Sequence, residues 1–420
     1  MSGREKIAVL PLRERARIRR EILRERLQVL LPEVMRETGI DMWLILCYED
    51  NLDPLFPTFI PPDTWCPILQ ILVFYLPPGG AELTRLNLSL TDTGDLYERP
   101  WQGTKEEEQW EYLVRFIADK NPQRIGINIG RTQWLAGGLA VPLYEKLRAV
   151  LPEKYIGRLT DAEELATRWA ATLSDREIDL LEHAVRIGQS LLDWIFSRAV
   201  ITPGATTISD LEWAYREKAA ELGLDVSFKP YFFLIRSPEA WRRFGEDDRT
   251  VRPGDFLRSD VGIRYLGLCT DHQRWAYVRR SSTDEPPPTF RRLLSQANKL
   301  QDIFLSQFQA GLTGNELLRQ ILASAREAGL PEPKVYSHSL GHFLHEPGPL
   351  IGLPWEQARC PGRGDVPLRE NYAFTMELSV TDEVPEWEGK KIQMALEEDI
   401  VFQGGRARIL GGRQTGFYLI

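Results

Sequence analysis

The segment SHSLGHFLHEPG, Ser337 to Gly348, holds three of the five histidines in a chain of 420 residues. These are His338, His342 and His345. Imidazole is the commonest protein ligand of transition metals and the usual proton carrier near neutral pH, so this local density indicates a chemical site. A histidine-bearing surface loop is the alternative. The acidic residues elsewhere in the chain help to decide between a chemical site and a surface loop.

Two aspartates upstream are spaced as the partners of a hairpin. Asp260 stands in FLRSDVGI and Asp271 in LGLCTDHQRW, 11 positions apart, with Gly262 and Gly267 between them. Two strands of about five residues each, joined by a short turn, bring such residues side by side. An aspartate at the end of a strand is often only a turn residue, so this spacing alone is a weak signal.

Two glutamates interrupt apolar, strand-like runs downstream. Glu377 lies in AFTMELSV and Glu397 lies in QMALEEDIVF. A carboxylate in a buried strand costs free energy unless it is paired or binds a metal, although a strand-edge carboxylate facing water is the alternative for each. Taken together, two aspartates, one histidine and two glutamates are a ligand set that suits divalent ions.

The composition is typical of a soluble globular enzyme: 43% hydrophobic and 27% charged residues, with a net charge of −8. A mildly acidic chain repels phosphate backbones, so no nucleic-acid partner is expected. The longest apolar runs are too short to span a bilayer and no signal peptide is visible, so no membrane association is expected. The cysteines form no CxxC pair, which favours a reducing, cytoplasmic setting; they are Cys47, Cys66, Cys269 and Cys360.

Hydrophobic patterns divide the chain into two domains. Strand-like and helix-like runs alternate in the first part, beginning with a helical pattern over residues 13–38 that Gly39 closes, and predict an α/β domain of residues 1–165. A capping box from Ser174 to Glu177 then opens a long helix. Helices and strands come in pairs after it, so residues 174–420 are expected to form an α+β domain.

The order Asp, Asp, His, Glu, Glu resembles the metallopeptidase family that contains methionine aminopeptidase, aminopeptidase P and prolidase, with creatinase as a non-peptidase relative. In that family the metal-binding histidine is followed by glycine three positions later and by a second histidine seven positions later, as in His338, Gly341 and His345. The last ligand precedes an acidic pair and an Ile-Val run, which favours Glu397 over Glu398. The resemblance implies the pita-bread fold for the catalytic domain, and the first 160 residues resemble the N-terminal domain of the prolidase and creatinase branch.

The resemblance also implies a centre of two divalent ions, drawn from Mn, Co, Fe and Zn with Mn favoured, which activate water for attack on a carbonyl. Asp271 and Glu397 would bridge the ions, Asp260 would complete one ion, and His338 and Glu377 would complete the other. Glu377 would also act as the proton shuttle during hydrolysis.

A further catalytic group by resemblance is His345, which would donate a hydrogen bond to the developing oxyanion. The implied reaction is peptide-bond hydrolysis in short peptides, as in Xaa-Pro dipeptidases or aminopeptidases, and the implied assembly is a homodimer.

Two recognition positions depart from the family. The usual histidine about 17 residues before the first aspartate is missing from Trp241–Phe244, and Ala395 stands where proline-specific members have arginine. Arg243 or Arg242 could pair with a substrate carboxylate, with an arginine on a solvated loop as the alternative. His342, which is out of register with the motif, is a further substrate-binding candidate. Two other functions stay open: a creatinase-like hydrolase of another small C–N substrate, and a non-catalytic binding protein with this fold.

Overall fold

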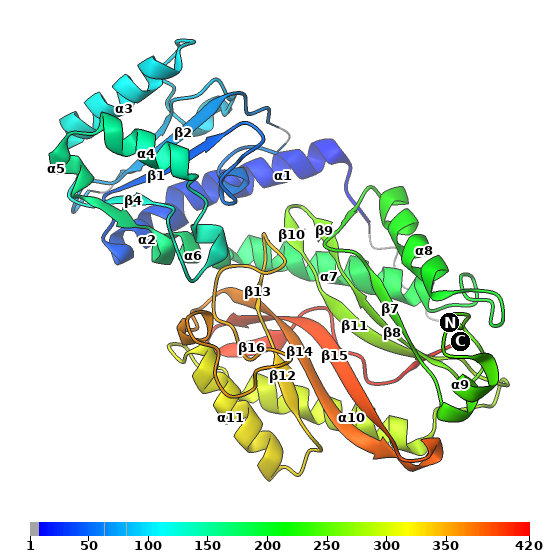
Figure 1. Ribbon diagram of the computed structural model, residues 1–420. Helices are drawn as coiled ribbons and strands as arrows, with labels where there is room; N and C mark the ends of the chain where they lie inside the picture. The colour runs from blue at the N-terminus through cyan, green and yellow to red at the C-terminus, as the bar shows by residue number, and fades with distance from the viewer. Residues whose placement is uncertain (1–7, 63, 81) are drawn as a thin grey trace. The chain divides into compact units, whose positions relative to one another are not determined.

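The computed structural model describes residues 8–62, 64–80 and 82–420, which form two compact units (Figure 1). The N-terminal unit is Pro11–Ala171. The C-terminal unit is Thr172–Ile420 together with the described residues before Pro11. Each unit has a sheet and a hydrophobic core of its own.

The N-terminal unit contains a mixed sheet in the order β3-β2-β1-β4-β5. Strand β1 is antiparallel to β2 and parallel to β4, which confirms the α/β class expected here. The strands are β1 (Met42–Tyr48), β2 (Leu69–Tyr75), β3 (Thr84–Asn87), β4 (Ile125–Ile127) and β5 (Leu159–Asp161). The helices are α1 (Leu12–Glu25), α2 (Leu31–Thr38), α3 (Glu106–Lys120), α4 (Val141–Val150), α5 (Glu153–Ile156) and α6 (Glu163–Ala171).

The first helical segment shows how local sequence sets these boundaries. A π-helical stretch, Arg26–Leu30, joins α1 to α2, so residues 12–38 are helical throughout. The segment ends at Gly39, whose φ of 65° is a left-handed conformation that glycine adopts without a Cβ penalty. The next strand, β1, is buried along nearly its whole length, as its continuous apolar run predicts.

The C-terminal unit is built on a large sheet in the order β12-β14-β15-β11-β8-β7. Strands β13, β16 and β17 pair with β14, β15 and β11, and a separate small sheet has the order β10-β9-β6. The strands before residue 300 are β6 (Asp225–Val226), β7 (Tyr231–Ile235), β8 (Phe256–Val261), β9 (Ile263–Tyr265), β10 (Leu268–Cys269) and β11 (His272–Tyr277). Those after it are β12 (Lys334–Tyr336), β13 (Ser339–Leu340), β14 (Tyr372–Val384), β15 (Lys390–Gln403), β16 (Arg406–Ile409) and β17 (Tyr418–Leu419).

The helices of this unit pack on its strands: α10 on β14 and β15, α8 on β7, and α7 on β9 and β10. They are α7 (Asp175–Ile195), α8 (Ile208–Glu221), α9 (Pro238–Phe244), α10 (Pro288–Ser306) and α11 (Gly314–Glu327). Helix α7 begins with the predicted capping box, in which Ser174 Oγ accepts from the Glu177 backbone N–H and the Glu177 carboxylate accepts from the Ser174 N–H.

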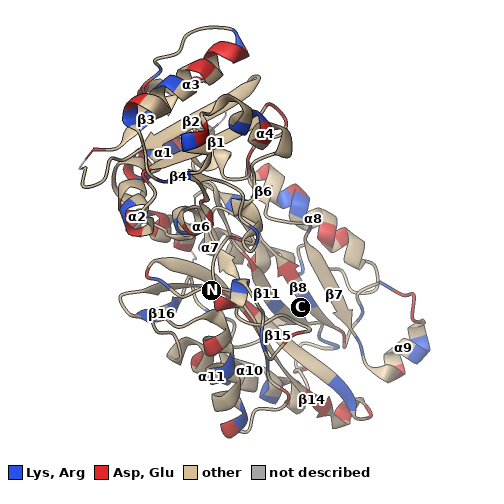
Figure 2. Cartoon of the chain, turned by 60° about the vertical axis from the view of Figure 1, so that its left-hand side comes forward, with Lys and Arg blue, Asp and Glu red and all other residues tan. Residues whose placement is uncertain are grey.

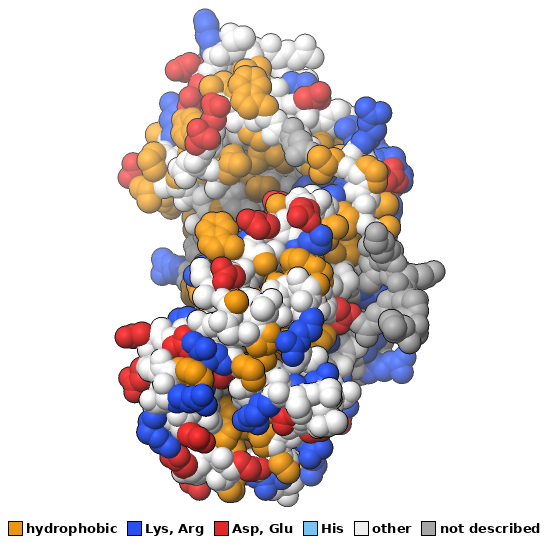
Figure 3. All heavy atoms as spheres, turned by 90° about the vertical axis from the view of Figure 1, so that its right-hand side faces the viewer, with side chains coloured by type: hydrophobic (Ala, Val, Ile, Leu, Met, Phe, Trp, Pro, Cys, Tyr) orange, Lys and Arg blue, Asp and Glu red, His pale blue; other side chains and the backbone are white. Residues whose placement is uncertain are grey.

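Every helix in the described ranges is too short or too polar to cross a lipid bilayer. One face of the molecule mixes basic, acidic and apolar side chains (Figure 3). Charges of both signs interspersed in this way are ordinary for a protein surface in water.

Of the two predicted aspartates, Asp260 lies on β8 and Asp271 directly precedes β11, the antiparallel neighbour of β8. Strands β8 and β11 pair directly, and β9 and β10 extend the hairpin to a turn at Leu266 and Gly267, both with positive φ. Within it, Gly262 leaves no room for a side chain: a Cβ there would lie 1.9 Å from the carbonyl oxygen of Thr270. The two segments of the hairpin can therefore approach this closely only because residue 262 is glycine.

Replacing Gly262 with alanine is expected to push the two segments of the hairpin apart. Overpacking of this kind costs about 3 kcal/mol, equivalent to a fall of roughly 6–12 °C in the unfolding temperature of a unit of this size. Thermal unfolding followed by circular dichroism measures the effect. Gly416→Ala is the matched control, because nothing lies within 4 Å of a Cβ there. Equal unfolding temperatures for the two variants would contradict the close approach.

Candidate metal centre

Neighbouring strands place polar residues in one row across the large sheet. Paired residues on adjacent strands point to the same face, so a row gathers side chains that are far apart in the sequence. From β8 through β11, β15 and β14 to β12, the row is Asp260, Gln273, Glu397, Glu377 and Tyr336. Three of the five predicted metal ligands therefore share one face of the sheet.

Three predicted ligands form a buried cluster: Asp271, His338 and Glu397 each offer a ligand atom within 4.8 Å of the others. The His338 Nε2 lies 4.0 Å from Asp271 Oδ2. Asp271 Oδ1 and Glu397 Oε1 are buried and have no hydrogen-bond partner within the described residues. A buried, unsatisfied carboxylate oxygen is costly unless something binds it. These residues therefore fit a divalent cation, which would take up the unsatisfied oxygens.

The other two predicted ligands lie beside this cluster. Asp260 and Glu377 line a small cavity of about 170 Å³ together with Gln273. Burial raises the pKa of Asp260 to about 6, and burial followed by the Asp260 charge raises the pKa of Glu377 to about 8. Burial and neighbouring carboxylates hold the pKa values of Asp271 and Glu397 well above their usual range. A cation would relieve this repulsion, since opposite charge favours the ionised form.

His338 is prepared as a neutral ligand. Its Nδ1 lies 3.1 Å from the Ser339 carbonyl oxygen and donates to it, which leaves Nε2 facing Asp271 as an acceptor. Burial, followed by the charge on His345, lowers the pKa of His338 to about 3. Backbone bonds to Thr375 fix the segment, because the Thr375 N–H donates to the His338 carbonyl oxygen at 3.0 Å.

Gln273 is a site residue that the motif comparison did not identify. Its Nε2 donates to Glu377 Oε1 at 3.1 Å and to Glu397 Oε2 at 2.8 Å, so it holds both carboxylates. A second supporting group is Asp399, whose carboxylate accepts from the Asp271 backbone N–H at 3.2 Å. The available signal was spacing: Gln273 follows Asp271 by two positions, the period at which residues of an extended chain point to the same side.

Gln273→Ala is expected to weaken metal binding by about 10–100-fold, because outer partners of ligand carboxylates orient them. Titration of the metal-free protein with Mn²⁺ measures the dissociation constant. Gln403→Ala is the matched control: Gln403 lies on the same strand as Glu397, and its amide donates to Asp175 at 2.8 Å, outside the cluster. An unchanged dissociation constant for Gln273→Ala would show that the amide does not support the ligands.

The two remaining histidines of the segment have different surroundings. His345 is exposed, and its ring centre lies 4.4 Å from that of His338, beside the cluster. The Nε2 of His342 lies 2.9 Å from Oε1 of the buried Glu177 at the start of α7. Its backbone N–H donates to Glu346 Oε1 at 3.0 Å. The catalytic role of His345 and the substrate role of His342 stay predictions.

The two candidate arginines lie on helix α9, at its basic end in Figure 2, and both are exposed. Arg242 pairs with Glu388 at 2.5 Å, and Arg243 lies over the ring of Phe244, 5.1 Å from its centre. The structure does not bring either arginine into the small cavity that Asp260 and Glu377 line. The substrate-binding role of Arg243 stays a prediction.

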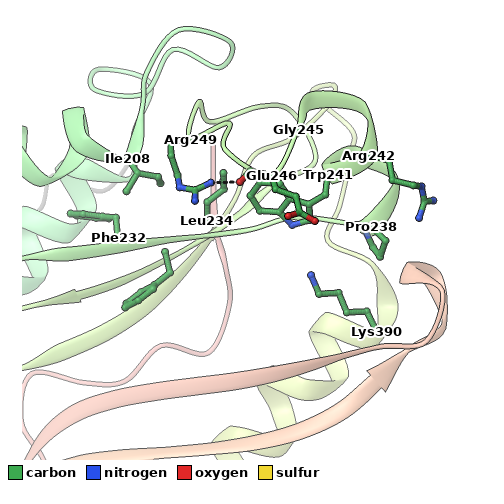
Figure 4. Close-up of a pocket in the computed structure, with 11 residues that line it drawn as sticks. Ile208, Phe232, Leu234, Pro238, Trp241, Arg242, Gly245, Glu246, Arg249 and Lys390 are labelled. Atoms are coloured by element: carbon green, nitrogen blue, oxygen red, sulfur yellow. Dashed lines mark hydrogen bonds between the residues drawn. The ribbon is translucent and has the colours of Figure 1, made fainter.

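A larger pocket of about 1010 Å³ lies beside α9 (Figure 4). Its lining includes Trp241, Lys390 and Arg249, whose Nη1 donates to the Glu246 carbonyl oxygen at 2.6 Å, and in Figure 4 the side chain of Arg242 extends away from the others. None of the predicted ligands is among the residues that line it. Two of the predicted ligands, Asp260 and Glu377, line the smaller cavity instead.

Comparisons with known proteins agree with this geometry. The model of metallopeptidase family M24 matches residues 179–404. Mitochondrial methionine aminopeptidase 1D of Mus musculus is 26% identical over 144 residues, which is 34% of this chain and 39% of that protein. The match thus spans well under half of that relative's length.

Two solved structures show the same fold over nearly the whole chain. An X-Pro aminopeptidase from Thermotoga maritima MSB8 has a TM-score of 0.64 at 19% identity, covering 92% of this chain and all of that one. A Xaa-Pro dipeptidase from Bacillus anthracis has a TM-score of 0.61 at 17% identity, covering 96% of this chain and all of that one. The expected two-domain architecture with a pita-bread catalytic fold is confirmed.

Proposed function

The chain belongs to metallopeptidase family M24, and from this premise we propose that it hydrolyses peptide bonds in short peptides, including Xaa-Pro bonds. The observation that carries the proposal is the buried cluster of Asp271, His338 and Glu397, with one unsatisfied oxygen on each carboxylate. Asp260 and Glu377 complete the donor set for two divalent ions, for which Mn²⁺ is the favoured metal. The names of the two solved structures support the substrate class.

Divalent ions bound here would polarise a substrate carbonyl and lower the pKa of a bound water. The chain's own groups handle the proton. Glu377 borders the cavity, so its carboxylate is placed to take a proton from water and pass it to the leaving amine. Exposed His345 beside His338 would donate a hydrogen bond to the oxygen on which charge develops.

A second candidate is a creatinase-like hydrolase of another small C–N substrate. It is favoured by Ala395, which lines the cavity where proline-specific members have arginine. For the assembly and location we propose a cytoplasmic homodimer, on the family resemblance and on the cysteines, which are all free thiols: Cys47, Cys66, Cys269 and Cys360.

The test combines metal analysis with a substrate panel. Protein purified without chelator is expected to hold about two ions per chain and to release proline from Xaa-Pro dipeptides when Mn²⁺ is added. Tripeptides and acidic amides complete the panel. Hydrolysis of an amide but of no peptide would favour the creatinase-like function over peptide hydrolysis. Bound metal without turnover of any substrate would indicate a binding protein, and absence of metal even after incubation with Mn²⁺ would refute the proposal.

A further inference from the structure

A half-buried cation, Arg258, lies beside the candidate metal centre in a position that the family motif does not include. Arg258 precedes Asp260 by two positions on β8, so both side chains point to the same face of the sheet. Its paired neighbours are Phe233 on β7 and Trp275 on β11. Trp275 in turn donates from Nε1 to the Ala395 carbonyl oxygen at 2.6 Å. Arg258 therefore lies in the row next to the carboxylates.

The surroundings of Arg258 hold its side chain and leave one donor, Nε, without an acceptor among the described residues. The guanidinium stacks over the ring of Phe233, 4.3 Å from the ring centre. Its Nε is buried and has no hydrogen-bond partner in residues 8–62, 64–80 and 82–420. Asp260, Glu377 and Glu397 act on the guanidinium through their charges. A guanidinium offers five N–H donors, and a buried donor without an acceptor costs free energy.

Arg258 borders a cavity in which a ligand could contact its guanidinium. Arg258 lines the space of about 170 Å³ with Asp260, Gln273 and Glu377. The lining also includes Ala395, whose small side chain leaves room where proline-specific relatives carry arginine. At about 30 Å³ per water, the space equals a few water molecules and suits a group the size of one small residue. Once metal ions neutralise the carboxylates, Arg258 is left as a cation facing this space.

The spacing between Arg258 and the ligands matches one peptide residue. Two positions along a strand span about 6.6 Å, which is therefore the approximate distance between the Cα atoms of Arg258 and Asp260. In a dipeptide, the C-terminal carboxylate lies about one residue, roughly 3.5 Å, beyond the scissile carbonyl, and a hydrogen bond adds about 2.8 Å. A peptide extending further would have to pass Arg258.

We propose that Arg258 binds the free carboxylate of the residue after the scissile bond, so that the chain prefers dipeptides to longer peptides or amides. This assignment rests on the proposed peptidase function. Arg258 then determines specificity: it supplies the carboxylate-binding cation that position 395 lacks, from the neighbouring part of the same face. A planar fork of donors suits a carboxylate better than a lysine ammonium does.

The test compares substrates with and without a carboxylate. Wild-type protein loaded with Mn²⁺ is expected to have a lower KM for alanyl-proline than for alanyl-prolinamide. Arg258→Gln should raise KM for the dipeptide by roughly 10–100-fold, with kcat little changed and the amide unaffected, because a charge-assisted hydrogen bond is lost. Arg258→Lys should restore part of the preference. Arg319→Gln, an exposed site on α11, is the control.

A binding measurement separates this inference from the proposed function. Titration calorimetry of proline and prolinamide into Mn²⁺-loaded protein should show tighter binding of proline, and Arg258→Gln should remove the difference while metal content and unfolding temperature stay unchanged. Loss of the difference in a protein that cleaves no peptide would refute the peptidase function and keep the carboxylate site. Cleavage of dipeptides with an intact preference in Arg258→Gln, or no preference in wild type, would overturn the inference alone.

Discussion

Glu397→Gln is expected to remove the bound metal and to lower the rate of peptide hydrolysis by about 10³-fold or more. Glu397 is fully buried in the cluster, and losing its charge removes several kcal/mol of interaction with a divalent ion and with the charge that develops during reaction. In metal-free protein the same change should raise the unfolding temperature, because one member of a group of mutually repelling buried carboxylates becomes neutral.

The neighbouring glutamate is the matched control. Glu398 is also fully buried, but its Oε2 pairs with Arg274 at 2.6 Å and its Oε1 accepts from the Gln414 N–H at 2.8 Å. Glu398→Gln should destabilise the protein by about 3–5 kcal/mol, since it leaves a buried arginine uncompensated, and should retain metal binding at temperatures where it is folded. Differential scanning fluorimetry with EDTA and with Mn²⁺, alongside elemental analysis, measures both effects. Metal retention by Glu397→Gln would show that Glu397 is not a ligand.

The second large effect is an inverted dependence of stability on pH. In metal-free protein the folded state keeps protons that the unfolded chain releases, because the folded pKa values of Asp260 and Glu377 are about 6 and about 8 against ordinary values of 3.8 and 4.5. Stability is therefore greatest near pH 4 and is lost as the pH rises to 8, by about 1.4 kcal/mol per pH unit for each retained proton.

Metal reverses this trend, because ligands must lose their protons to bind it. Unfolding temperatures between pH 5 and 8 should fall with pH in EDTA and rise with pH in Mn²⁺. Ion pairs such as those of Asp248 with Arg252 and Arg236 hold the aspartate pKa well below its usual range, so their effect on stability falls below pH 4, outside this window. Glu377→Gln should flatten the slope in EDTA. A metal-free protein whose unfolding temperature is constant or rises over this range would contradict the coupling of the carboxylates.

Local chemistry made much of the fold predictable. A glycine at position 39 ends a helix because its conformation is local, and the capping box from Ser174 to Glu177 needs only one turn of helix. Glu377 and Glu397 stood out because an acid within an apolar run is costly wherever the strand lies. The helix α9 was missed although Ser237 caps it and a proline follows at the first helical position, signals that a short segment can carry.

The rest depends on register between strands, which a single sequence does not display. Gln273 contacts both glutamates because β11 pairs with β15 at that one position, and Arg258 enters the cavity because β8 pairs with β11. The family position of the missing histidine instead directed attention to Arg243, on a helix outside the cavity. The helix α6, Glu163–Ala171, lies where a boundary between domains was expected, because its mixed polar and small residues give a weak signal over so few positions.

The row of side chains across the large sheet has a consequence for biosynthesis. Asp260 and Glu397, which share that row, are made 137 positions apart, and β15 is the strand that joins β14 to β11. At 5–20 residues per second, roughly 7 to 27 seconds separate their synthesis. A nascent chain that has exposed only Asp260 and Asp271 holds just part of the ligand set. The proposed metal ligands are therefore complete only in the last stage of folding, and metal binding by the full set indicates that the catalytic sheet has formed.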